Sequence, residues 1–212
     1  MCGIAGIISI KKRSFDYSAF CTLGIANDSR GGDSRGIFID GKYEYGVNDK
    51  KYFQNFFYKS DLLNSITNSK IALLHCRKAS IGTISEKTAQ PVIIKNNDKI
   101  EFVLIHNGTI RNYKELAKKY IPNIDITGMT DSQVMANIFY YNGYESLSEY
   151  EGGAVFVIVD YRFTKPKTFL FKGASKKTKY AKTITAERPL YFTIDSDDKE
   201  LVFSSIGAYL LA

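Results

Sequence analysis

The sequence contains no tryptophan, only three cysteines and only four prolines among its 212 residues. The cysteines stand at positions 2, 21 and 76, an odd number without the spacing of a disulfide framework. This pattern argues against a small secreted protein held together by disulfides. A reducing compartment fits better, because it keeps the thiol of Cys2 usable, and we therefore expect a cytoplasmic protein.

Long apolar runs are also missing, and none approaches the roughly 20 residues that a membrane-spanning helix needs. The first residues do not read as a signal peptide, because Gly3 and Gly6 interrupt the apolar run and a basic stretch follows it at 11–13. No Pro-rich or Ser-rich linker and no internal repeat divides the chain. With 44% hydrophobic residues, including 15 Tyr and 14 Phe, the sequence predicts a single globular domain over residues 1–212 with no membrane partner.

The formal net charge of +7 raises the question of nucleic acid as a partner. The basic residues are spread along the chain, however, and many of them stand beside acidic ones. The one dense basic stretch, at 172–182, has the composition of a solvated loop. We therefore do not expect nucleic acid as a partner, while docking of this stretch onto an acidic partner protein stays open.

Hydrophobic periodicity predicts the secondary structure. The strand-like stretches are 3–9, 36–40, 43–47, 70–76, 91–95, 101–105, 153–160, 167–172, 189–194 and 201–204. The helical stretches are 15–27, 59–67, 112–120, 130–142 and 145–150. With strands clustered at both ends and the longest helices in pairs, this order predicts an α+β fold in which helices cover antiparallel sheets. The pattern does not decide between one sheet and two.

The N-terminal residues are the first candidate for chemistry. If Met1 is removed, Cys2 carries both a thiol and a free α-amino group, which titrates at about 7.7–8.0 and can accept a proton near working pH. Cys2 followed by Gly3 favours removal of Met1, because a small second side chain fits the aminopeptidase. Cys2 would then be an N-terminal nucleophile. In the alternative interpretation Cys2 is a small core hydrophobe at the start of a strand.

Two further candidates combine glycine or a strand end with charged side chains. The run Arg30-Gly31-Gly32-Asp33-Ser34-Arg35-Gly36 leads into a strand, and it has the composition of a tight turn. Arg77 follows a buried strand, and its planar guanidinium can grip a carboxylate through two hydrogen bonds. Arg77 could equally pair with a structural Asp or Glu.

The second half of the chain contains two more candidate sites. Asn107 and Gly108 end a strand, and together they offer the side-chain amide and backbone N–H that stabilise an oxyanion. An Asn-Gly pair is also a common turn dipeptide. Asp131 stands at a helix start, where its carboxylate can hold an ammonium group, although Thr130 or Asp131 can also be a simple N-cap.

His75, Cys76 and His106 are of metal-ligand type and lie on predicted strands. Adjacent strand residues point to opposite faces of a sheet, so His75 and Cys76 cannot readily share one ion. We therefore expect no metal and no cofactor.

Taken together, these segments resemble the glutaminase domain of class II glutamine amidotransferases. These are the N-terminal nucleophile hydrolases fused to asparagine synthetase, glucosamine-6-phosphate synthase, PRPP amidotransferase and glutamate synthase. The resemblance covers nearly the whole chain, from Met1-Cys2-Gly3-Ile4-Ala5-Gly6 through Ser204-Ser205-Ile206-Gly207-Ala208-Tyr209-Leu210. It implies a four-layer αββα sandwich of two mainly antiparallel sheets, with L-glutamine as substrate.

The resemblance also assigns roles to the catalytic residues. It implies that Cys2 attacks the glutamine side-chain amide while its own α-amino group shuttles the proton. A γ-glutamyl thioester and ammonia form first, and water then releases glutamate. Asn107 and the N–H of Gly108 would form the oxyanion hole.

The remaining assignments concern substrate binding. The resemblance implies that Arg77 holds the α-carboxylate of glutamine and that Asp131 holds its α-ammonium group. Ser80 stands where family members use a hydroxyl near the carboxylate. Arg30 would support the surroundings of the nucleophile.

The sequence departs from the family at two positions and in its length. Lys78 stands where many sugar-amidating members have Trp, and Ile81 where they have His, so the subfamily stays open. Most members carry a synthase domain after the glutaminase, and this sequence has none, so we expect a glutaminase subunit that passes ammonia to a separate acceptor enzyme. The alternatives are an N-terminal nucleophile amidase acting on another amide and a catalytically silent binding module of the same fold.

Overall fold

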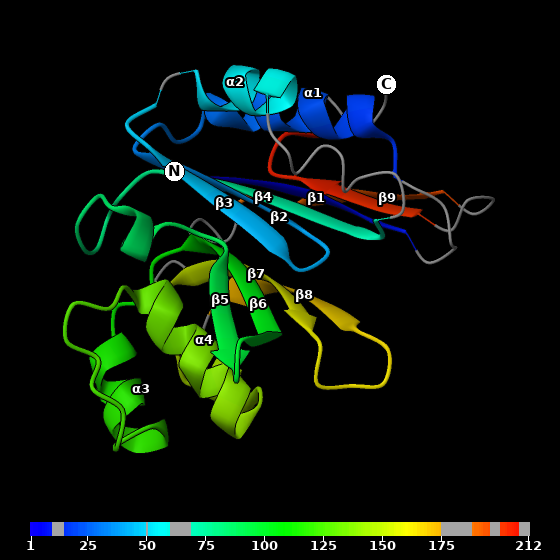
Figure 1. Ribbon diagram of the computed structural model, residues 1–212. Coiled ribbons are helices and arrows are strands. Elements are labelled where there is room, and N and C mark those ends of the chain that lie inside the picture. The colour runs from blue at the N-terminus through cyan, green and yellow to red at the C-terminus, as the bar shows by residue number, and fades with distance from the viewer. Residues whose placement is uncertain (10–14, 50, 60–68, 175–187, 196–199, 208–212) are drawn as a thin grey trace. The chain divides into compact units, whose positions relative to one another are not determined.

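The computed structural model describes residues 1–9, 15–49, 51–59, 69–174, 188–195 and 200–207 (Figure 1). The chain folds into two units, each with its own sheet. Unit 1 comprises Met1–Ala79, Ile84–Pro91 and Leu190–Ala212, and unit 2 comprises Ser80–Thr83 and Val92–Pro189. In each unit the sheet is antiparallel and has helices against it.

Unit 1 is built on a six-stranded sheet in the order β3-β2-β4-β1-β10-β9, in which every neighbouring pair is antiparallel. Its strands are β1 (Gly3–Ser9), β2 (Ser34–Ile39), β3 (Lys42–Val47), β4 (Ile71–Arg77), β9 (Tyr191–Asp195) and β10 (Glu200–Ser204). All residues of β1, β2 and β4 are buried. These three strands therefore form the rigid centre of the unit.

Two helices cover one face of this sheet, α1 (Tyr17–Asp28) and α2 (Tyr52–Lys59) (Figure 1). Asp16 caps α1, since its side chain accepts a hydrogen bond from the backbone N–H of Ala19 at 3.0 Å. The core between helices and sheet is rich in phenylalanine. Its buried residues include Ile7, Phe20, Leu23, Ile37, Phe53, Phe56 and Leu74.

Unit 2 is built on a four-stranded sheet in the order β5-β6-β7-β8. Its strands are β5 (Val92–Asn96), β6 (Lys99–Gly108), β7 (Gly153–Asp160) and β8 (Lys167–Ala174). The helices α3 (Tyr113–Tyr120) and α4 (Asp131–Asn142) pack on this sheet through a core that includes Leu104, Leu116, Val134, Ile138, Phe139 and Phe156. Two short 3₁₀ helices are Glu86–Thr88 in unit 1 and Glu145–Ser148 in unit 2.

The predicted α+β class with antiparallel sheets is confirmed, and the structure contains two sheets. Each predicted strand is present with bounds that shift by up to a few residues. The predicted helix at 145–150 is a 3₁₀ helix, Glu145–Ser148. The predicted helix at 59–67 lies, apart from its first residue, outside the described residues, as does most of the basic stretch at 172–182. The sequence analysis missed α2, because aromatic residues and Asn are weak helix formers.

Among the described residues no helix has the length and apolar character that crossing a membrane would require.

Packing around β1 generates a prediction for Gly6. A Cβ added there would lie 2.5 Å from Cζ of Phe203 and 2.7 Å from the backbone oxygen of Ala72, so Gly6→Ala forces the neighbouring strands apart. We expect it to lower the free energy of unfolding by about 1–3 kcal/mol, the usual cost of overpacking. The control is Gly173→Ala in β8, whose nearest neighbour would be Tyr150 Oη at 3.7 Å. Urea unfolding measures both variants, and equal midpoints would contradict the prediction.

Candidate functional site

Three strand ends meet at one edge of the unit 1 sheet. Because β1 and β4 are antiparallel with Gly3 opposite Cys76, the residue before β1 lies beside the end of β4. The register of β2 on β4 places Ser34 opposite Arg77, so the start of β2 reaches the same edge. Cys2, Arg77 and the turn before Ser34 are therefore neighbours, although they are far apart in the sequence.

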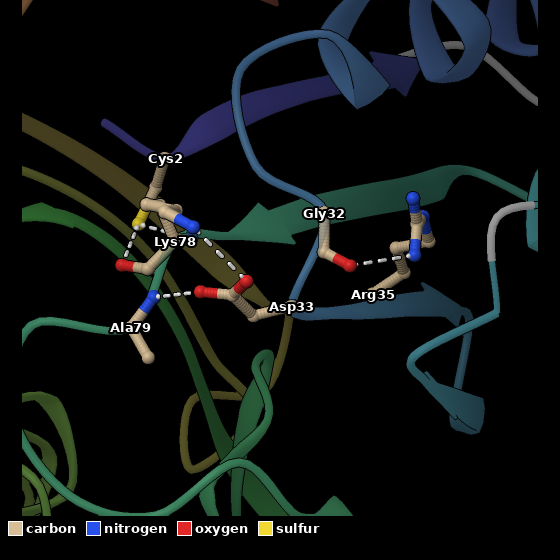
Figure 2. Close-up of polar contacts among 6 residues, drawn as sticks. All are labelled: Cys2, Gly32, Asp33, Arg35, Lys78 and Ala79. Carbon is tan, nitrogen blue, oxygen red and sulfur yellow. Dashed lines mark hydrogen bonds and ion pairs between the residues drawn. The ribbon is translucent and has the colours of Figure 1, made fainter.

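The thiol of Cys2 is partly exposed at this edge, whereas Cys76 is fully buried. The Cys2 Sγ accepts a hydrogen bond from the backbone N–H of Lys78 at 3.4 Å and donates to the Lys78 carbonyl at 3.6 Å (Figure 2). Burial raises the pKa of the Cys76 thiol well above its usual value. Of these two cysteines, Cys2 is therefore the accessible one, and Cys76 is a core residue.

Arg30 holds the backbone of the candidate nucleophile. Its Nε donates to the carbonyl of Cys2 at 3.1 Å, and its own backbone N–H is bound to the carbonyl of Asn27 just before the end of α1. The turn that follows passes close to β4, because a Cβ on Gly31 would lie 2.4 Å from the carbonyl oxygen of Cys76. Glycine at 31 therefore lets this turn approach the backbone of β4.

Arg77, the last residue of β4, is only 4% exposed. Its Nη1 donates to the hydroxyl of Thr88 at 3.3 Å, and that hydroxyl in turn donates to the carbonyl of Ser85 at 3.1 Å. The short 3₁₀ helix thus supplies a neutral contact that orients the guanidinium. The sequence analysis did not link Thr88 to Arg77, because nothing in the local pattern connects the two residues.

In unit 2, β6 delivers Asn107 and Gly108 at its end. Asn107 is 1% exposed, and within the part of the chain that the structure describes its Nδ2 has no hydrogen-bond partner. An amide nitrogen that is buried without a partner costs free energy, and it is a donor ready for an incoming oxygen.

Asp131 stands at the first position of α4, and Thr130 is the N-cap. Gln133 N–H donates to the Thr130 hydroxyl, and the Gln133 side chain accepts from Thr130 N–H, which completes a capping box. The buried carboxylate of Asp131 accepts the backbone N–H of Ile110 at 2.9 Å and that of Ser132 at 2.9 Å. Of the two capping residues that the sequence suggested, Thr130 is the cap.

The first turn of α4 holds the end of β6 on both sides of Asn107 and Gly108. Before them, Nδ1 of His106 lies 2.9 Å from the hydroxyl of Ser132. After them, the N–H of Ile110 is bound by Asp131. The structure therefore brings together the predicted oxyanion donors and the predicted ammonium ligand within unit 2. The sequence analysis considered His106 only as a metal ligand and did not assign a role to Ser132.

The predicted site residues divide between the two units. Cys2, Arg30 and Arg77 belong to unit 1 and lie at one sheet edge, while Asn107, Gly108 and Asp131 belong to unit 2 and lie around the start of α4. Ser80 belongs to unit 2 and is exposed in a bend. In the described part of the chain no group of three or more His, Cys, Asp or Glu side chains is arranged to hold a metal ion.

Comparison with known proteins identifies the family. The family model described as "Glutamine amidotransferase domain" matches residues 60–212. The chain belongs to this family of glutamine amidotransferase domains.

Curated relatives extend the likeness to the N-terminal residues. The chain is 28% identical over 216 residues to a putative asparagine synthetase [glutamine-hydrolyzing] of Methanocaldococcus jannaschii, with 97% of this chain and 34% of that protein covered. It is 27% identical over 139 residues to a glutamine–fructose-6-phosphate aminotransferase of Halalkalibacterium halodurans, with 65% of this chain and 22% of that protein covered. The chain thus spans about a third or less of the length of these relatives.

A solved structure shows the fold. Glutamine phosphoribosylpyrophosphate amidotransferase from B. subtilis, complexed with ADP and GMP, aligns with a TM-score of 0.65 at 22% identity, covering 96% of this chain and 42% of that one. The resemblance to class II glutamine amidotransferases and the N-terminal nucleophile hydrolase fold, both predicted from the sequence, are confirmed.

The buried His106 of this amidotransferase domain generates a prediction of pH dependence. Burial lowers its pKa below the usual 6.5, against the opposing charge of Asp131. Between the folded pKa and about 6.5 the unfolded chain therefore binds a proton that the folded chain does not. Stability rises with pH in that window, and it falls as pH drops below about 6.5 by up to about 1.4 kcal/mol per pH unit.

Urea unfolding of wild type and His106→Asn at pH 7.5 and 5.5 measures this effect. Asn keeps a polar group near Ser132 but does not titrate, so we expect a smaller loss of stability between the two pH values in the variant. An equal loss in both proteins would show that His106 is not the group responsible.

Proposed function

We propose that this chain hydrolyses the side-chain amide of L-glutamine, with Cys2 as the nucleophile once Met1 is removed, and that it supplies the ammonia to a separate acceptor enzyme. The observation that carries the proposal is the thiol at position 2, which is partly exposed at the sheet edge where β4 ends in Arg77. A glutamine amidotransferase domain with its thiol in this position supports attack on an amide.

The reaction then follows from the groups at Cys2. The sulfur attacks the amide carbon, the α-amino group of Cys2 takes the thiol proton, and the carbonyl oxygen becomes an oxyanion. The amide nitrogen takes that proton and leaves as ammonia, which gives a γ-glutamyl thioester. Attack by water releases glutamate and restores the thiol.

The oxyanion would be held by Nδ2 of Asn107 and the N–H of Gly108. The buried Asn107 amide, which lacks a partner among the described residues, supports this role. A donor that is already desolvated and fixed by its strand needs no reorganisation when negative charge develops.

Arg77 would bind the α-carboxylate and Asp131 the α-ammonium group of glutamine, with the Ser80 hydroxyl near the carboxylate. The fixed guanidinium of Arg77 suits a planar carboxylate. The Asp131 carboxylate already accepts two backbone N–H groups, and its remaining lone pairs can accept an ammonium group. Recognition of both charged groups favours a free amino acid over an internal peptide residue.

The acceptor chemistry is proposed to lie on another protein in the same reducing compartment, the cytoplasm. The relatives whose names state glutamine hydrolysis or amino transfer to fructose 6-phosphate are far longer than this chain, which spans 34% and 22% of them.

Glutamate release from glutamine by the mature chain tests the proposal, with Cys2→Ala expected to remove the activity. Cys21→Ala is the matched control, because Cys21 is also partly exposed but lies on α1, and it should keep the wild-type rate. Competition by asparagine and other amides separates a glutaminase from an amidase of different specificity. Equal rates for wild type and Cys2→Ala, or retention of Met1 by intact mass, would favour a silent module.

Asn107→Ala is expected to lower kcat by about 10²–10³-fold with little change in KM, since an oxyanion donor acts mainly in the transition state. Because the substitution breaks no hydrogen bond of Nδ2 to a described residue, the unfolding midpoint of the Asn107→Ala variant should stay near that of the wild type. Asn137→Ala is the control, as it removes a bond to the Gln133 carbonyl at 2.9 Å, away from the strand end. If KM rose while kcat stayed constant, Asn107 would be a binding residue instead.

A further inference from the structure

The segment after β4 is held from two opposite sides. On one side the Cys2 sulfur contacts two neighbouring peptide groups, through the N–H of Lys78 and through the carbonyl of Lys78. On the other side Asp33 binds the opposite ends of the same two peptide groups. Its backbone N–H donates to the carbonyl of Arg77 at 3.0 Å. Its Oδ2 accepts the N–H of Ala79 at 2.8 Å (Figure 2). Both peptide groups that contact the sulfur are therefore bound by Asp33.

Asp33 is itself fixed by its surroundings. The backbone N–H of Asn48 donates to its carbonyl at 3.1 Å. The carbonyl of the preceding residue, Gly32, accepts a hydrogen bond from Nη1 of Arg35 at 3.1 Å (Figure 2). Arg35 also forms an ion pair with Asp28. Because the backbone around Asp33 is fixed by these bonds, its carboxylate can keep the peptide groups on either side of Lys78 in one orientation.

For the Asp33 carboxylate, the hydrogen bond from the Ala79 N–H is a stronger interaction than the ion pair with the Lys78 ammonium. Asp33 Oδ1 lies 3.2 Å from Nζ of Lys78, but the Lys78 side chain is 60% exposed and such pairs contribute little. The Ala79 N–H is also the largest cause of the lowered pKa of Asp33, ahead of Lys78. The carboxylate is thus an ionised acceptor for backbone.

We propose that Asp33 is a positioning residue for the nucleophile: it orients the two peptide groups on which the Cys2 sulfur rests. The Lys78 N–H then stabilises a thiolate, and the Lys78 carbonyl accepts the proton of the neutral thiol. Without the side-chain bond from the Ala79 N–H to Asp33, the 78–79 peptide can rotate, and the Lys78 carbonyl turns away from the sulfur. The inference deepens the proposed function and rests on it for the glutamine readout.

The test compares D33A with D33N. Both variants remove the negative charge near the thiol, so they share any direct electrostatic effect on it, but only asparagine still offers an oxygen to the Ala79 N–H. Their difference isolates the hydrogen bond. If D33A does not fold, D33L takes its place, because leucine keeps the branched shape of asparagine without an acceptor.

Two readouts are measured. The pH dependence of Cys2 alkylation by iodoacetamide, located by peptide mass mapping, should have a midpoint about 0.5–1 pH unit lower in D33A than in D33N, because the neutral thiol loses the Lys78 carbonyl as an acceptor. Glutamate release should show a kcat about five- to tenfold lower in D33A than in D33N, with KM for glutamine within about twofold.

D40A is the control, because it removes another Asp side chain that accepts backbone N–H groups of β4 and the residue before it. Asp40 accepts the N–H groups of Lys70 and Ile71 at the opposite end of that strand. D40A should lower stability but keep the wild-type alkylation profile.

Identical alkylation midpoints for D33A and D33N would overturn the proposal, as would an equal shift in D40A. If the wild-type chain releases no glutamate, the proposed function fails while the alkylation comparison still decides the role of Asp33. If glutamate release requires Cys2 but D33A matches D33N in both readouts, the proposed function stands and the positioning role falls.

Discussion

The antiparallel pairing of β1 with β4 is the constraint on which the rest of unit 1 depends. With Gly3 opposite Cys76, the chain enters the sheet beside the point where β4 leaves it. Both strands are buried along their whole length, so a slip by one residue would turn every side chain to the opposite face. The burial of two apolar strands therefore fixes where the thiol of Cys2 lies, and no polar contact could do this alone.

Both units use a carboxylate to hold backbone where a strand ends. Beyond the last ladder bond, N–H groups need other partners, because unpaired buried backbone is costly. In unit 1 Asp33 satisfies Ala79, and in unit 2 Asp131 satisfies Ile110. These bonds also determine how the intervening residues are presented, Lys78 in the first case and Asn107 with Gly108 in the second. The demand for backbone hydrogen bonds and the geometry of the candidate site are thus met by the same side chains.

The sequence predicted those elements whose own residues specify them. The apolar strands and the cap at Thr130 are local signals, and each was found where expected. The contacts that organise the site join distant segments, as Asp33 joins Ala79 across 46 residues and His106 meets Ser132 across 26. Periodicity carries no information on such pairings, which depend on strand register. The resemblance to a family suggested the reacting residues, but not the backbone groups that hold them.

The polar groups around the start of α4 differ in how completely they are bonded. The Asp131 carboxylate has two backbone donors, and His106 and Ser132 bind each other, but within the described residues the Asn107 amide nitrogen has no partner. The hydroxyls of Tyr144 and Ser146 are also buried without a described partner, yet a hydroxyl can donate or accept. An amide nitrogen can only donate, so its missing partner must be an acceptor. We propose that this fixed donor binds an oxygen that arrives with the substrate.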